Sequence, residues 1–258
     1  MAYNILTGGR CDHRNRLPSI VQLINDAAPD LLGICECTDF DDTRAADFND
    51  LCSATGMIGF LNHAPSGHHV ALLRRPSVRV RKINGSAVGM YNGLVRATLE
   101  TEAAGAMTVV MSHLHPFASH QRLIEMQTVL GKSRATDNAL IMGDMNSVAP
   151  EDATPTLEAA PDHLATRFKD ERAKLDTRII AAPVAHGFID LGARAGASPT
   201  YPTALDGKDM RYGVRVRLDY IFATVRLAER CREFRVIHGR AAESASDHLP
   251  VIADFAVD

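Results

Sequence analysis

Short apolar runs recur along the 258-residue chain, and segments with a helical pattern separate them. From Leu17, apolar residues return every three or four positions, and this predicted helix ends at Pro29. Helical patterns also cover 42–54 and the segment opened by Pro116. The apolar runs between them have the length and character of buried strands. Beyond a first strand around Tyr3, they are 31–35, 58–61, 69–73, 78–81, 94–100, 107–112, 139–142, 218–223, 234–238 and 250–255.

Some of these strands are joined by helices and others by short turns. The runs 94–100 and 107–112 predict a hairpin, and Asn84 with Gly85 predicts a turn after 78–81. Such a mixture favours an α/β fold with two mixed sheets covered by helices over a purely parallel fold. The length is near the upper limit for one hydrophobic core, so we expect one domain over 1–258.

Composition and charge exclude several broad classes of protein. Lys and Arg number 28 against 31 Asp and Glu, so the net charge of −3 provides no positive field for nonspecific polyanion binding. The apolar runs are shorter than the roughly 20 residues of a membrane span. No basic and apolar leader opens the sequence, so we expect a soluble cytoplasmic protein. The five cysteines lack framework spacing and predict free thiols.

Polar residues that can carry chemistry stand at the ends of several apolar runs. Asp144 and Asn146 follow the run 139–142 after Gly143. If the strand continues, alternation places both side chains on one side, where a carboxylate and an amide can position a water. Taken alone, the same pattern is more typical of an ordinary turn.

Three further positions have the same ambiguity. Asp219 lies in an apolar strand, where an unpaired carboxylate is costly, so it needs a partner, and a histidine is the natural one. Asp247 and His248 precede the last strand and could serve as metal ligand and phosphate-facing imidazole, although such a pair is commonly a surface turn. Glu36 follows the run 31–35, where a surface glutamate is the alternative.

In this order, the motifs resemble those of the endonuclease/exonuclease/phosphatase superfamily, the metal-dependent phosphoesterases related to pancreatic DNase and exonuclease III. The resemblance extends over nearly the whole chain. Its motifs are Tyr3-Asn4-Ile5, Pro29-Asp30 to Glu36, Ser112-His113-Leu114, Gly143 to Asn146, Arg217 to Phe222 and Ser246 to Val251. It implies a four-layered sandwich of two mixed β-sheets flanked by helices, with the active site at their shared edge. It indicates the fold more strongly than the substrate, because the superfamily hydrolyses nucleic acids, phosphoinositides, sphingomyelin and small nucleotides.

The resemblance also implies a metal centre. Glu36 would be the principal ligand, with Asp247 and Asn4 close to the ion, directly or through water. Oxygen ligands of this kind suit Mg²⁺ or Mn²⁺ and not Zn²⁺.

The remaining motif residues would carry the chemistry. Asp144 and Asn146 would orient and deprotonate the attacking water. His248, kept protonated by Asp219, would stabilise charge on the phosphoryl oxygens. His113 would contact phosphate or protonate the leaving group. It stands in a Ser-His-Leu motif like that of the DNase, sphingomyelinase and deadenylase branches of the superfamily. The apurinic-site nucleases carry a tyrosine motif at the corresponding place.

We therefore expect a Mg²⁺-dependent phosphoesterase that acts on a small or nucleotide-like substrate. The chain has no Trp and only 5% aromatic residues, which disfavours long polynucleotides. A DNase-like or RNase-like nuclease is one alternative, and a repurposed member with metal-dependent chemistry on a non-phosphate metabolite is another. His115 and Arg122 would touch an anionic substrate or face solvent. The irregular segment 148–215, including Thr200, Tyr201 and Pro202, is expected to supply substrate-facing loops.

Overall fold

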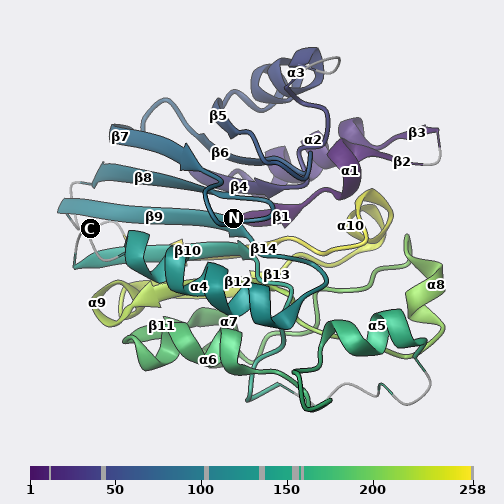
Figure 1. The fold of residues 1–258 in the computed structure, drawn as a ribbon. Helices are drawn as coiled ribbons and strands as arrows, with labels where there is room; N and C mark the ends of the chain where they lie inside the picture. The colour runs from purple at the N-terminus through teal and green to yellow at the C-terminus, as the bar shows by residue number, and fades with distance from the viewer. Residues whose placement is uncertain are drawn as a thin grey trace.

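The computed structural model describes residues 1–11, 13–41, 45–101, 105–133, 137–152, 157 and 160–256 of the chain. Two six-stranded mixed sheets pack face to face, with helices on their outer sides (Figure 1). The first sheet has the order β13-β14-β1-β4-β6-β5 and the second has the order β11-β12-β10-β9-β8-β7. The predicted α/β sandwich of two mixed sheets is therefore confirmed.

The elements have the following bounds. The first sheet contains β1 (Ala2–Asn4), β4 (Leu31–Cys35), β5 (Ile58–Asn62), β6 (Val70–Arg74), β13 (Cys231–Val236) and β14 (Val251–Phe255). The second contains β7 (Arg79–Ser86), β8 (Leu94–Thr101), β9 (Gly105–His113), β10 (Asn138–Asp144), β11 (Phe188–Asp190) and β12 (Asp219–Thr224). A separate small hairpin consists of β2 (Arg10–Cys11) and β3 (Arg14–Asn15). The helices are α1 (Leu6–Gly9), α2 (Leu17–Ala27), α3 (Ala45–Thr55), α4 (Ser119–Ser133), α5 (Asp162–Arg167), α6 (Arg178–Ala185), α7 (Leu191–Ala195), α8 (Gly207–Met210), α9 (Val225–Ala228) and α10 (Arg240–Ala245).

Two large apolar layers, and a third, smaller cluster that includes Leu164 of α5, hold these elements together. The larger core lies between the sheets and extends under α2, whose buried Leu17, Ile20 and Ile24 are the residues of the predicted helical period. The second core lies between the outer face of β9, β10 and β12 and helices α4 and α6. Burial on both faces explains why β10 is a continuous apolar run rather than an alternating one.

Within the described strands, each sheet contains one parallel pair, β1 with β4 and β9 with β10. The carboxyl ends of parallel strands meet at one edge of a sheet. Asn4 therefore lies beside Cys35 at the end of the first pair, and Asp144 lies beside His113 at the end of the second. Because the two sheets are stacked, these two strand ends face each other.

The predicted turn at Asn84 and Gly85 is wrong. β7 continues through both residues, which pair with Arg96 and Val95 of β8. Gly85 is required by packing instead, because a Cβ atom there would lie 2.0 Å from Oδ1 of Asn62. The predicted helix at 42–54 begins outside the described residues, which resume with α3. In the part of the chain that is described, no helix combines the length and apolar character needed to cross a membrane.

Candidate active site

Three predicted site residues lie in one row across the second sheet. Asp144, the last residue of β10, is paired in register with His113 of β9 and with Asp219 of β12. Residues in one row of a sheet project to the same face, so strand pairing alone brings these side chains together. All three are buried.

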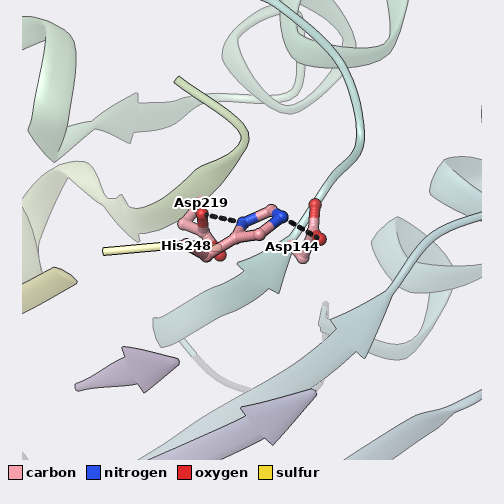
Figure 2. A group of neighbouring side chains, drawn as sticks. All are labelled: Asp144, Asp219 and His248. Carbon is pink, nitrogen blue, oxygen red and sulfur yellow. Dashed lines mark hydrogen bonds and ion pairs between the residues drawn. The ribbon is translucent and has the colours of Figure 1, made fainter. Parts of the chain in front are cut away.

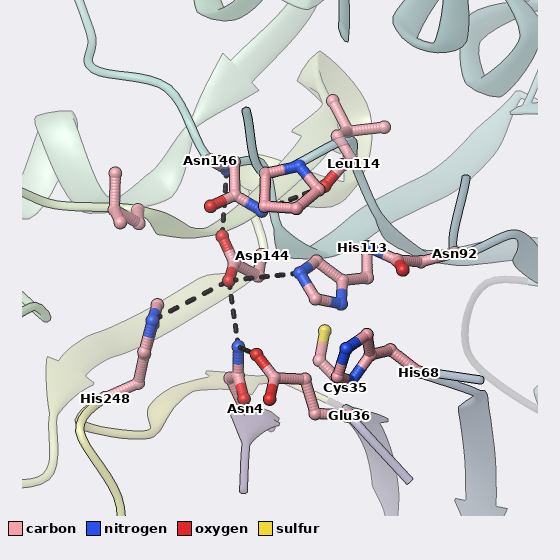
Figure 3. Close-up of polar contacts among 12 residues, drawn as sticks. Asn4, Cys35, Glu36, His68, Asn92, His113, Leu114, Asp144, Asn146 and His248 are labelled. Atoms are coloured by element: carbon pink, nitrogen blue, oxygen red, sulfur yellow. Dashed lines mark hydrogen bonds and ion pairs between the residues drawn. The ribbon is translucent and has the colours of Figure 1, made fainter. Parts of the chain in front are cut away.

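The first sheet contributes Asn4 and Glu36 from the ends of β1 and β4. The Asn4 amide Nδ2 donates to Oε1 of Glu36 and to Oδ2 of Asp144, each at 3.0 Å, and so connects the two sheets (Figure 3). The backbone N–H of Thr7 donates to the other oxygen of Glu36 at 3.0 Å. Glu36 takes a left-handed φ of 60°, an uncommon conformation that is typically retained at functional sites.

Asp144 is the centre of the arrangement. Its Oδ1 accepts from the backbone N–H of Asn146 at 2.8 Å, and its Oδ2 lies 3.6 Å from His113 Nε2 and 3.8 Å from His248 Nε2. Burial alone would raise the pKa of this carboxyl, but the two imidazoles outweigh that effect and lower it. Gly143 makes the close approach to β9 possible, since a Cβ atom there would lie 1.9 Å from the carbonyl oxygen of Ser112.

Asp219 has the histidine partner that its burial requires. His248 Nδ1 lies 2.7 Å from Asp219 Oδ2, so the imidazole stands between this carboxylate and that of Asp144 (Figure 2). Thr200 donates to the same oxygen of Asp219 at 2.7 Å. Burial alone would lower the pKa of His248, but the carboxylates of Asp219, Asp144 and Asp247 raise it to about 10. The imidazole is therefore positively charged at neutral pH.

His113 is in the opposite state. Burial lowers the pKa of this imidazole despite the nearby carboxylates, so it is neutral at physiological pH. Its Nδ1 is buried and has no hydrogen-bond partner in the structure. The two histidines that flank Asp144 thus differ in charge and in free hydrogen-bonding capacity.

Glu36 and Asp247 are two further carboxylates of the site, close enough for Glu36 to raise the pKa of Asp247. Burial raises the pKa of Asp247 to about 6, and the carboxylates of Glu36 and Asp206 add to this effect. Burial would also raise the pKa of Glu36, but His113, the Thr7 amide and Asn4 lower it. A second acidic group comprises Asp144, Asp219 and His248, whose potential ligand atoms all lie within 4.8 Å of one another. Either set could hold a cation.

Asn146 reaches the site by a different route from the one that strand alternation predicts. β10 ends at Asp144, and Asn146 has a left-handed φ of 50°. Its Nδ2 donates to the Leu114 carbonyl at 2.9 Å, and its Oδ1 accepts from Arg167. The backbone N–H of Asn146, rather than its side chain, orients Asp144.

Arg122 and His115, the two neighbouring candidates for contact with an anionic substrate, have structural contacts. Arg122 is fully buried and donates to Ser147 Oγ and to backbone carbonyls, so neither predicted role, substrate contact or solvated residue, holds. Four internal hydrogen bonds explain how the charge is tolerated there. His115 is half-buried, and its Nδ1 accepts from the backbone N–H groups of Phe117 and Ala118 just before α4.

Two residues border the site without having been singled out in the sequence. Arg167 at the end of α5 donates to Asn146, and no spacing in the irregular segment predicts it. His68 lies beside Glu36 and His113 and is bonded to Thr38 through Nδ1 at 3.0 Å (Figure 3). The sequence indicates His68 only weakly, through its position after Gly67 and beside a second histidine. It precedes β6, whereas the predicted site residues were sought at strand ends.

Comparisons with known proteins agree with this architecture. Residues 1–248 match the model of a family described as the endonuclease/exonuclease/phosphatase family, whereas no curated protein sequence matches. The structure is similar to an AP endonuclease from Archaeoglobus fulgidus, with a TM-score of 0.71 and 23% identity over 99% of this chain and 98% of that one. It is similar to the 3' phosphatase NExo from Neisseria bound to a product DNA hairpin, with a TM-score of 0.70 and 17% identity over 99% of this chain and 98% of that one. It is also similar to D. rerio TDP2 complexed with a single-strand DNA product, with a TM-score of 0.68 and 17% identity over 98% of this chain and 96% of that one.

Proposed function

The chain belongs to the endonuclease/exonuclease/phosphatase family, and from this membership we propose that it is a Mg²⁺- or Mn²⁺-dependent phosphoesterase acting on a small or nucleotide-like substrate. Members of the family are phosphodiesterases and phosphatases and generally use divalent metal ions. One observation carries the proposal: a buried carboxylate, Asp144, is fixed by two donors and flanked by a charged and a neutral histidine. This arrangement supplies both a base and charge-stabilising donors in one place.

Asp144 is the proposed general base. Its lowered pKa keeps it ionised, so it can accept a proton from the attacking water. The Asn4 amide and the Asn146 N–H each donate to a different oxygen and fix the plane of the carboxylate. The Asn146 side-chain oxygen retains a second lone pair that can accept a hydrogen bond from the same water.

The two histidines are proposed to act on the phosphoryl group. His248, held positive by Asp219, stabilises the charge that develops on the phosphoryl oxygens, and its fixed orientation removes the cost of reorganisation. His113 is neutral, which favours hydrogen bonding to a phosphate oxygen over protonation of the leaving group.

The proposed metal ligands are Glu36 and Asp247. The fit rests on their mutual repulsion, which contributes to the raised pKa of Asp247 and which a dication would relieve. Asn4 already uses its amide to hold Glu36 and Asp144, and it is therefore assigned to orienting the ligand. His248 is protonated and cannot ligate, so the group of Asp144, Asp219 and His248 is less suitable. A divalent ion held by Glu36 and Asp247 would supply Lewis-acid stabilisation of the negative charge that develops in the reaction.

A nuclease activity is the second candidate. Two of the similar structures, NExo from Neisseria and D. rerio TDP2, are bound to DNA products. In this chain, the hairpin of β2 and β3 has a surface hollow of about 280 Å³, lined by Arg10, Cys11, His13, Arg14 and Asn15. The hairpin follows α1 directly, and the N–H of Gly8 in α1 donates to the Glu36 carbonyl at 2.7 Å. These cations therefore follow closely in sequence a residue that is bonded to the proposed metal ligand. A nucleic acid strand could contact them with its backbone.

Hydrolysis of a small panel tests these proposals. We would assay a nitrophenyl phosphomonoester, a bis(nitrophenyl) diester, a short single-stranded DNA and a short RNA, each with Mg²⁺, Mn²⁺ or EDTA. We expect cleavage of at least one small ester that EDTA abolishes. Preference for DNA or RNA that weakens in the Arg14→Gln variant would favour the nuclease. If the folded protein binds Mg²⁺ but cleaves nothing, the phosphoesterase proposal fails and metal-dependent chemistry on a non-phosphate substrate is favoured.

A further inference from the structure

Arg167 brings a positive charge to the edge of the candidate site. It is the last residue of α5, in the irregular segment between β10 and β12. Its Nη2 donates to the side-chain oxygen of Asn146, two residues after Asp144. Its guanidinium is also close enough to lower the pKa of Asp144. Arg167 therefore reaches the surroundings of Asp144 through Asn146. Glu36 is connected to Asp144 by a different residue, Asn4 (Figure 3).

The position of Arg167 is fixed by its surroundings. The buried Arg122 donates to the Arg167 carbonyl and to Ser147 Oγ, and so ties the end of α5 to the segment after β10. The Arg167 guanidinium lies 5.6 Å from the ring centroid of Phe168 and 5.6 Å from that of Tyr201. The Tyr201 ring lies 4.9 Å from the ring of His248. Aromatic contacts of this kind restrict a guanidinium while leaving its edge free to donate.

The hydrogen-bonding capacity of Arg167 is incompletely used. Its Nε is buried and has no partner in the structure, although buried donors are nearly always satisfied. Among the described residues, no carboxylate forms an ion pair with it, in contrast to Arg217, which is bonded to Asp152 and Asp190. Because that Nε is buried, an anion would have to bind through the Nη groups, of which Nη2 already donates to Asn146. A half-buried, oriented guanidinium without an ion pair among the described residues is suited to such an anion.

We propose that Arg167 binds phosphoryl oxygens of the substrate, through donors that Asn146 leaves open. The planar guanidinium matches two oxygens of a phosphate at once. Together with the charged His248, which also contacts the Tyr201 ring, it provides two cations for a phosphate beside a site rich in carboxylates. This inference rests on the proposed phosphoesterase function and assigns one of its substrate contacts.

A purely structural role makes a different prediction. If Arg167 only positions Asn146, its loss would slow catalysis without changing affinity for phosphate. Direct binding requires that affinity for inorganic phosphate falls even when no reaction occurs. Binding and turnover must therefore be measured separately.

The test is calorimetric titration of inorganic phosphate into the full-length protein with Mg²⁺ present. Arg167→Gln should weaken phosphate binding about 10- to 100-fold, the effect of one charge-assisted contact. Arg167→Lys should weaken phosphate binding less, because lysine keeps the positive charge and loses only the paired donors of the planar guanidinium. Arg172→Gln, at an exposed position in the same segment, is the matched control and should bind like the wild type. Circular dichroism melting establishes that each variant is folded.

Two outcomes overturn the inference. The first is that Arg167→Gln binds phosphate as tightly as the wild type does, whether or not its kcat is lower. The second is that the wild type does not bind phosphate. Because phosphate binding requires no turnover, a wild type that binds phosphate through Arg167 but hydrolyses none of the esters would contradict the proposed function and leave this inference standing.

Discussion

Two regions of the molecule build the site, and they hold their side chains by different means. At the ends of β1, β4, β9, β10 and β12, strand register places the side chains, as in the row of His113, Asp144 and Asp219. In the connection from 145 to 218, side-chain contacts do so, as for Arg167 on Asn146 and Thr200 on Asp219. The first region is part of the sheets, whereas the second contains α5, α6, α7 and α8 and, apart from the edge strand β11, lies outside them (Figure 1).

The difference indicates how tasks are divided. Register fixes the relative positions of several groups at once, and it cannot change without breaking the sheet and its core. A loop contact fixes one group at a time and can change independently. The proposed base, its histidines and the metal ligands come from the strand ends and the loops directly joined to them. We therefore expect substitutions at strand ends to remove activity and substitutions in the connection to adjust it.

The largest effect is expected for Asp144→Asn. Loss of the proposed base should lower kcat at least about 10³-fold. The amide is nearly the same size, and its oxygen can still accept from the Asn146 N–H, whereas the hydrogen bond from Asn4 is lost. The loss of one hydrogen bond should leave the fold intact. Steady-state hydrolysis of the best ester in the panel measures the loss, and circular dichroism provides the folding control. A variant with undiminished kcat would remove Asp144 from the mechanism.

His248→Gln should follow, with a loss in kcat of about 10²- to 10³-fold from removal of one charge-stabilising donor. Since the carboxylates of Asp219, Asp144 and Asp247 raise the pKa of His248 to about 10, the wild-type rate should fall as pH rises through that value. The variant should lack this fall. The pH–rate profiles of both proteins measure it, and an identical alkaline limb in the two would exclude His248 as its source.

The same group predicts a change in stability. A histidine whose pKa is raised above its unfolded value near 6.5 stabilises the fold fully below that pH and loses this contribution as pH rises through about 10. In EDTA, the free energy of unfolding of wild type should therefore exceed that of His248→Gln by less at pH 10 than at pH 6. Urea titrations at several pH values measure the difference, and a gap that stays constant with pH would contradict the assignment.

Glu36→Gln should act mainly on the metal. We expect the Mg²⁺ concentration for half-maximal activity to rise at least about tenfold, the lower bound for residues that support a metal. Excess Mg²⁺ should recover part of the rate, unlike in Asp144→Asn. Glu233→Gln, at an exposed position of β13, is the control and should leave the Mg²⁺ requirement unchanged. Loss of rate at every Mg²⁺ concentration would assign Glu36 a role other than metal binding.

The strand-end region could be predicted from the sequence because its rules are local. An apolar run identifies a buried strand, and a polar residue at its end identifies the sheet edge, as for Glu36 and Asp144. The need of Asp219 for a histidine followed from the cost of a buried charge, and His248 meets it. The distances from Asn4 to Glu36 and Asp144 could not be predicted, because they depend on how the two sheets stack.

The connection could not be predicted for a related reason. Arg122 lies on the polar side of a helix, and the sequence pattern does not reveal that this side faces a buried turn. The hydrogen-bond partners of Arg122 come from 115–116, 147 and 167. Arg167 acquires its place through those same contacts. Such positions depend on non-local side-chain packing, which neither period nor spacing encodes. The turn predicted at Gly85 failed likewise, because the glycine accommodates Asn62 from another sheet.

The smallest effect, about tenfold in kcat, is expected for Thr200→Val, and it tests the connection directly. The hydroxyl donates to Asp219 at 2.7 Å and accepts from the Leu218 N–H at 3.0 Å, so its removal leaves a buried donor unpaired and should cost about 1–3 kcal/mol of stability. Thr200→Ser keeps the hydroxyl and should restore both quantities. The His248 contact and strand register still hold Asp219 in the valine variant, which is why the loss should be modest. Full activity in Thr200→Val would mean that register alone positions Asp219, whereas a loss as large as that in His248→Gln would mean that the connection is as necessary as the strand ends.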